Sequence, residues 1–197
     1  MRRTATARIL RFGSLVGPVA FVSAWAVSGS VTGRTYSPVR DTISRLAAIG
    51  ADTRPLMTAG MVVFGVAMPA SAVAWKQALG GRSWMLVAAT GVSTLGVAAT
   101  PLDHSGLVDR LHEIAAGTGY LTLATIPLAA RAALAQRGFA RHGAVGSVLS
   151  VVSIASLATS LAVEQTGLFQ RVGLTVIDLW LVASVPVLGT LITRNDH

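Results

Sequence analysis

Six long apolar stretches, each of a length that crosses a lipid bilayer, constrain this chain more than any other feature. A helix needs about 20 apolar residues to cross the hydrocarbon layer of a membrane. Only 12% of the residues are charged, whereas a soluble domain carries about 25%. We therefore expect an all-α integral membrane protein, a six-helix bundle with short loops that forms one transmembrane domain over 1–197. The expected spans are residues 12–30, 56–75, 84–100, 111–130, 144–163 and 172–192.

The basic residues are distributed unequally between the two sides of such a bundle. Positively charged loops stay in the cytoplasm, so we expect both termini to be cytoplasmic. The high content of alanine, glycine and arginine suits a bacterium, so the expected membrane is its inner membrane. The outer side then carries mixed charge, with the bases Arg34, Arg40, Arg45, Arg54, Arg110 and Arg171 and the acids Asp41, Asp52, Asp103, Asp109, Glu113 and Glu164. The cytoplasmic side carries one acid, Asp196, and the bases Arg2, Arg3, Arg8, Arg11, Lys76, Arg82, Arg131, Arg137, Arg141 and Arg194.

The net charge of +8 does not indicate a nucleic-acid partner. Arginines flank the apolar stretches and do not form a basic stripe with interleaved aromatic residues, which nucleic-acid binding requires. They are better explained as topology signals and as contacts to lipid headgroups. Membrane lipids are the expected partners, and a membrane-protein partner or a second copy of the chain remains open.

The longest connection, residues 31–55, predicts a short amphipathic helix on the outer side. Ser37 suits a helix cap and Pro38 suits the first helical position. Ile43, Leu46 and Ala47 fall on one face of that helix. We expect this face to rest on the membrane surface.

Small residues inside the spans indicate close helix packing, because small side chains let two membrane helices approach. They are Gly60, Gly91, Gly96, Gly117 and Gly119, with Ser147, Ser150, Ser153, Ser156 and Ser160 along the fifth span. The alternative is a polar groove for the headgroup of a ligand.

Asp178 is an acidic residue deep inside a predicted span, six residues from the start of the sixth. A carboxylate at that depth is costly unless it faces the bundle interior and finds a partner. Candidate partners at similar depth are Ser153, Ser156, Thr118 and Tyr120. Asp178 either locks helices together or serves proton or ligand binding.

A second polar cluster precedes and opens the fourth span. Asp109 and His112 are three residues apart and share a helix face. With Asp103 and His104 they could hold a divalent metal, since imidazole and carboxylate are ordinary metal ligands. The alternative is an ion-pair network with Arg40, Arg45, Arg110 or Arg171.

Several kinds of chemistry have no sequence support. The chain has no cysteine, so thiolate metal sites and disulfides are excluded. It has no GxSxG motif, no phosphate-binding glycine loop and no dinucleotide fingerprint. No cofactor other than that metal is expected, and whether the protein is an enzyme is left open.

The segment Tyr36–Leu46, with its Ser-Pro-x-Arg-Asp-x-Ile-Ser pattern, and Gly60, Asp103, His112 and Gly167–Arg171 together resemble the bacterial membrane proteins of domain-of-unknown-function family 998. The resemblance covers nearly the whole chain. It implies the multi-pass topology and marks Asp41, Ser44, Asp103, His112 and Arg171 as candidate functional residues. Gln170 departs from the charged residue that the resemblance implies there.

Three functions therefore remain in view. The first is binding of a lipid or a partner through the outer face. The second is a metal-assisted hydrolase or transferase at the outer leaflet. The third is a small proton-coupled transporter that uses Asp178.

Overall fold

The computed structural model describes residues 2–33 and 36–195, and this part of the chain is helical with no strand. Arg34 and Asp196, which count in the charge distribution above, lie outside the described residues. The elements are α1 (Arg2–Leu10), α2 (Gly13–Val31), the 3-10 helix η2 (Ile43–Ala47), α3 (Arg54–Leu79), α4 (Ser83–Ala99), α5 (Gly106–Gln136), α6 (Ala140–Ser160) and α7 (Thr166–Arg194).

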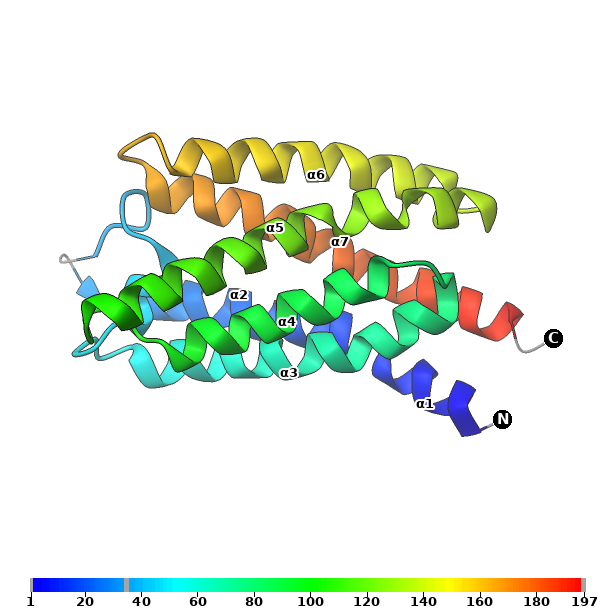
Figure 1. The fold of residues 1–197 in the computed structure, drawn as a ribbon, viewed down its shortest axis with the longest axis horizontal. Coiled ribbons are helices and arrows are strands. Elements are labelled where there is room, and N and C mark those ends of the chain that lie inside the picture. Colours follow the sequence, from blue (N-terminus) through cyan, green and yellow to red (C-terminus); the bar gives the residue numbers. More distant parts are fainter. Residues whose placement is uncertain (1, 34–35, 196–197) are drawn as a thin grey trace.

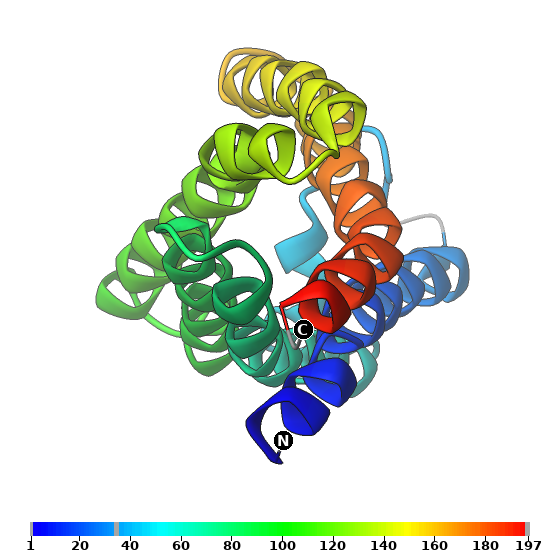
Figure 2. The ribbon, with the colours of Figure 1, turned by 90° about the vertical axis from the view of Figure 1, so that its right-hand side faces the viewer.

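The six long helices α2 to α7 form one bundle (Figure 1). Each packs against the next along the chain, and α7 returns to contact α2 and α3. The view along the bundle shows the resulting ring of helices (Figure 2). The expected all-α six-helix fold is confirmed. Because the number of long helices is even, the chain begins and ends at the same end of the bundle (Figure 1).

Length and composition make this a multi-pass membrane protein. Four segments are long and apolar enough to cross a bilayer: Ala5–Val31, Arg54–Leu79, Ala140–Ser160 and Thr166–Arg194. Helix α4 is apolar but has 17 residues, and α5 has 31 residues with a polar beginning. Many large apolar side chains point outward, among them Val66, Val92, Leu121, Val148 and Leu179. Hydrocarbon is the solvent that suits such a surface.

A helix covers most of each of the six predicted stretches, with different bounds. Helix α7 begins at Thr166, six residues before the predicted start, so Gln170 and Arg171 lie on the helix and not in a loop. Helix α6 begins at Ala140 and therefore includes His142. The predicted spans end at charged and polar residues. In the structure, a helix continues through such residues where another part of the protein binds their side chains. Helix α1 was not predicted.

The short helix in the first long connection is present, but it lies deeper than expected. It is a five-residue 3-10 helix from Ile43 to Ala47, and Ser37 and Pro38 precede it in a separate turn. Ile43 and Leu46 are 2% and 1% exposed, so the apolar face packs into the bundle and does not rest on the membrane surface. We call this end of the molecule, with η2 and the connections before α5 and α7, the η2 end.

Candidate functional site

Arg171 on α7 holds the loop that precedes η2. Its Nη1 donates to the carbonyl oxygens of Pro38 at 2.7 Å, Asp41 at 3.1 Å and Gly167 at 2.9 Å. Its Nη2 donates to the Tyr36 hydroxyl. The guanidinium is buried and is bound by oxygens that carry no full charge. The expected ion pair between Arg171 and an outer acid is therefore not formed.

The same corner requires a glycine on the first turn of α7. A Cβ on Gly167 would lie 2.7 Å from the Pro38 carbonyl oxygen and 2.8 Å from Nη1 of Arg171. These separations are shorter than real Cβ contacts. Gly167 thus lets the loop approach α7 closely enough for Arg171 to bind its carbonyl groups.

Gln170, the neighbour of Arg171, fixes η2 to the bundle. Its Oε1 accepts from the Ile43 amide at 2.7 Å, and its Nε2 donates to the Tyr120 hydroxyl on α5. An amide can donate only through its nitrogen, so the Ile43 contact also fixes which way the Gln170 amide faces. Gln170 is 4% exposed, and a neutral amide at this position avoids burying a further charge.

Ser44 and His112 form a buried hydrogen-bonded pair between η2 and α5. The Ser44 Oγ lies 2.9 Å from Nε2 of His112, and Nδ1 of His112 lies 2.6 Å from the Thr100 carbonyl oxygen. A carbonyl oxygen only accepts, so Nδ1 carries a hydrogen, and in the neutral imidazole Nε2 is then the acceptor. The Ser44 hydroxyl therefore donates to an imidazole whose tautomer and orientation are fixed by the backbone.

The acids of the cluster are engaged in other contacts. Arg45 and Asp103 form an ion pair at 2.7 Å, with both side chains about half exposed. Asp109 Oδ1 accepts from the Asp103 amide at 3.1 Å, and Asp41 Oδ2 accepts from the Ser37 amide at 2.6 Å. Of the ion pairs considered from sequence, the one that the described residues contain joins Arg45 to Asp103.

The candidate metal ligands Asp103, His104, Asp109 and His112 do not converge. Nowhere in residues 2–33 and 36–195 are three or more histidine, aspartate or glutamate side chains placed to share an ion. Both ring nitrogens of His112 are occupied by Ser44 and Thr100. The geometry therefore offers no support for the metal-assisted mechanism.

Two cavities meet at η2. The larger has a volume of about 630 Å³ and lies between η2, α5, α6 and the start of α7. Its wall combines polar and charged groups with an apolar side from α6: Thr42, Ser44, Arg45, Asp103, Asp109, His112, Glu113, Tyr120, Thr166 and Gln170, with Leu157, Ala158 and Leu161. We call it the η2 cavity.

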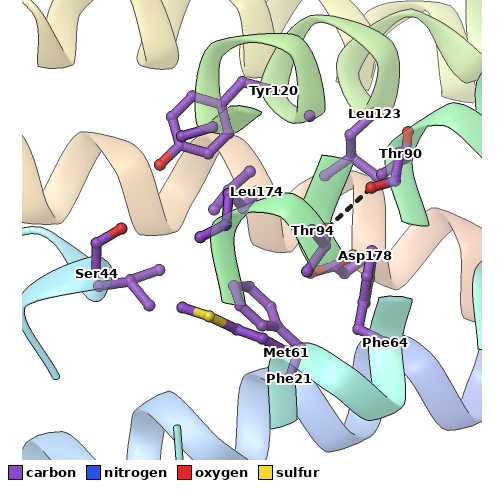
Figure 3. Close-up of a pocket in the computed structure, with 14 residues that line it drawn as sticks. Phe21, Ser44, Met61, Phe64, Thr90, Thr94, Tyr120, Leu123, Leu174 and Asp178 are labelled. Atoms are coloured by element: carbon purple, nitrogen blue, oxygen red, sulfur yellow. Dashed lines mark hydrogen bonds between the residues drawn. The ribbon is translucent and has the colours of Figure 1, made fainter. Parts of the chain in front are cut away.

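The smaller cavity, of about 50 Å³, lies inside the bundle. Figure 3 shows that Ser44 and Tyr120 are at one side of it and Asp178 at the other. Phe21, Met61, Phe64, Leu123 and Leu174 supply most of its apolar wall, and Thr90 and Thr94 add hydroxyl groups. We call it the inner cavity.

Asp178 has no hydrogen-bond partner among the described residues. It is 2% exposed, and neither carboxyl oxygen is bonded. Three of the four partners considered from sequence are bonded elsewhere, since Ser153 donates to Gly173 and Thr118 to Ile114, while Tyr120 binds Gln170. The fourth, Ser156, does not bond Asp178 either. Depth along the helix was a sound criterion, but it does not fix the direction in which each side chain points.

Sequence reasoning placed Asp41, Ser44, Asp103, His112 and Arg171 at one face without assigning their contacts. The structure puts all five at the η2 end, divides them between the Arg171 corner, the Ser44–His112 pair and the Arg45–Asp103 ion pair, and leaves Asp178 apart. Gln170 and the Thr100 carbonyl were not recognised as parts of the site. A backbone carbonyl has no signature in the sequence, whereas the departure of Gln170 from the charged residue that the resemblance implies was a signal available in advance.

Comparison with known proteins bears on the same segments. The model of a family described as "Protein of unknown function (DUF998)" matches residues 15–185. The chain belongs to the DUF998 family. The resemblance inferred from Tyr36–Leu46 and the residues near α5 and α7 is thereby confirmed. Neither a curated protein nor a solved structure matches this DUF998 protein.

Proposed function

We propose that this DUF998 protein binds a membrane phospholipid in the η2 cavity, with the headgroup against the polar wall and an acyl chain along α6. The cavity itself is the observation that carries the proposal. Its volume of about 630 Å³ falls in the range of small-molecule sites, about 300–1,000 Å³. One polar and one apolar wall match the two parts of an amphipathic ligand.

The charges of the wall favour a headgroup with an ammonium group. Asp103, Asp109 and Glu113 line the cavity against the single cation Arg45, which is already paired with Asp103. Glu113 is exposed and has no hydrogen-bond partner among the described residues. An anionic headgroup would meet an excess of negative charge there, whereas an ammonium group would be attracted.

We further propose that the η2 end faces outward from the cytoplasmic membrane of a bacterium and that both termini are cytoplasmic. The excess of bases in the connections at the opposite end supports this orientation. Reporter fusions at each terminus test it, because a periplasmic reporter signal at either one would reverse the assignment.

Native mass spectrometry of the purified protein tests lipid binding directly. From an equimolar mixture of phosphatidylethanolamine and phosphatidylglycerol, we expect preferential retention of phosphatidylethanolamine. Replacing Glu113 by Gln should lower that preference several-fold, whereas Glu164→Gln, which removes an exposed charge outside the cavity, should not. Retention of neither lipid by the wild-type protein would contradict the proposal.

A second candidate function, proton-coupled transport, is favoured by Asp178 alone. A buried carboxyl without a partner that lines an internal cavity is the kind of group that takes up and releases protons in transporters. Flux into proteoliposomes under an imposed pH gradient tests this function. Equal flux by the wild type and Asp178→Asn would contradict it.

A further inference from the structure

We infer that Ser44 and His112 are a nucleophile and its general base, and that the protein cleaves a carboxylic ester of the phospholipid held in the η2 cavity. The inference rests on the proposed lipid binding and adds a reaction to it. The inference follows from the geometry of the pair and from its position at the wall of two cavities. The sequence contains no serine-hydrolase motif that would indicate it.

The first argument is the direction of the hydrogen bonds. Serine is a weak nucleophile until a base accepts its proton, and a hydrogen bond of 2.6–3.2 Å to that base is the structural requirement. The Ser44 Oγ lies 2.9 Å from Nε2 of His112. The Thr100 carbonyl at Nδ1 occupies the position of the orienting third group of a triad. It would also stabilise the imidazolium after proton transfer.

The second argument is access. Ser44 is 7% exposed at the molecular surface, but its side chain lines both the η2 cavity and the inner cavity. An ester bound in the η2 cavity therefore reaches Ser44 without unfolding of η2. The ester group of a phospholipid lies between headgroup and acyl chain, which is the boundary between the polar and apolar walls.

The third argument is a hydrogen-bond donor for the oxyanion. Gln170 Nε2 donates to the Tyr120 hydroxyl, so the phenol oxygen is an acceptor in that contact and its own hydrogen is left to donate elsewhere. Tyr120 lines the same two cavities as Ser44. Figure 3 shows both hydroxyl groups at the same side of the inner cavity. A phenol is an effective donor to a developing oxyanion.

The reaction then balances with water as the only co-reactant. The Ser44 Oγ attacks the ester carbonyl carbon while its proton passes to Nε2 of His112, and Tyr120 donates to the oxyanion. The bond from the carbonyl carbon to the alcohol oxygen breaks, and His112 protonates the leaving alcohol. Water next attacks the acyl-serine and gives one proton to His112, which returns it to Ser44 as the carboxylic acid leaves.

A fluorophosphonate probe tests the nucleophile on the full-length protein in detergent. We expect covalent labelling of the wild type at Ser44, found by peptide mass spectrometry, and no label there in Ser44→Ala. Ser30→Ala, which removes an exposed hydroxyl bonded to Val27 on α2, should label normally. Absence of label at Ser44 in wild-type protein that retains lipid would overturn the inference and leave lipid binding intact.

The base and the oxyanion donor have their own variants. His112→Gln should slow labelling by about 10²–10⁴-fold, and Tyr120→Phe should slow it by about 10²–10³-fold. His104→Gln changes an exposed histidine of the same end and should leave the rate unchanged. Normal labelling in His112→Gln would overturn the role of His112.

The substrate is tested with phosphatidylethanolamine in mixed micelles. Release of fatty acid by the wild type, and none by Ser44→Ala that still retains the lipid in native mass spectrometry, supports the inference. Labelling of Ser44 in a wild-type protein that retains no lipid would overturn the proposed function and, with it, a phospholipid as the substrate.

Discussion

The Arg171 guanidinium donates to the Tyr36 hydroxyl across 135 residues of sequence, and its Cζ lies 5.7 Å from the centroid of the same tyrosine ring. A second aromatic ring is close as well, since the Trp25 ring centroid is 5.3 Å from Cζ. Three backbone carbonyl groups also accept hydrogen bonds from this guanidinium. A buried cation here is stabilised by dipoles and π-faces, without a carboxylate in contact.

Arg171→Lys should therefore destabilise the protein although the charge is kept. An ammonium group cannot reach the phenol and the carbonyl groups in the planar geometry of a guanidinium. We expect a loss of about 1.5–3 kcal/mol, the usual contribution of a hydrogen bond to a charged group. Thermal unfolding in detergent measures it. Arg110→Lys, at an exposed arginine on α5, is the matched control, and equal melting temperatures for the two variants would contradict the prediction.

Tyr36 makes the η2 end sensitive to alkali. Burial raises the pKa of its phenol above the ordinary value of 10.0, and the nearby Arg171 lowers it in part. The unfolded chain then loses this proton before the folded protein does, so stability is complete below about pH 10 and falls as the pH rises through the folded pKa. Tyr36→Phe removes the titrating group. Its melting temperature should fall less than that of the wild type between pH 9 and about 11.

Close helix contact should make Gly91 intolerant of a side chain. A Cβ there would lie 2.9 Å from the Gly65 carbonyl oxygen and 2.9 Å from Cγ of Pro69, both on α3. Neither neighbour is a flexible side chain, so Gly91→Ala should cost about 1–3 kcal/mol. Gly117→Ala is the control, since a Cβ there meets nothing within 4 Å and alanine is the better helix former by about 1 kcal/mol. Thermal unfolding should move in opposite directions for the two variants.

Asp178→Leu should stabilise the fold. The aspartate carboxyl is buried with neither oxygen bonded, and an apolar side chain with the same heavy-atom branching removes that desolvation cost. We expect a gain of about 1–3 kcal/mol in the free energy of unfolding, read as a higher melting temperature. A large loss of stability would mean that Asp178 has a bonded partner in the membrane. Stabilisation joined to loss of proton-coupled flux would assign Asp178 to transport.

Hydrophobic pattern alone predicts the six long helices, because each must present apolar side chains to lipid along most of its length. It does not predict where η2 lies. Ile43, Leu46 and Ala47 form an apolar face that suits a membrane surface and a protein core equally well. Gln170 and Arg171 on α7 bind the backbone of this connection and thereby place η2 in the protein core and not on the membrane surface.

The sequence predicts which residues belong to the candidate site, but it does not predict which of them contact one another. The topology alone puts Ser44 and His112 on the same side of the membrane. Their hydrogen bond depends on the path of the connection that contains η2 and on the Thr100 carbonyl. Neither of these can be recognised from the type of residue in the sequence. The same limit applies to Asp178, whose depth follows from its position in α7 but whose orientation depends on helix rotation.

Ser44, Ala116 and Tyr120 line both the η2 cavity and the inner cavity. The two compartments are thus neighbours, and η2 lies against both, with the Gln170 amide and the His112 imidazole among the groups that bond it to the bundle. Acylation of Ser44 would remove the hydroxyl proton that His112 accepts, so the wall shared by the two cavities would change each time the proposed reaction runs.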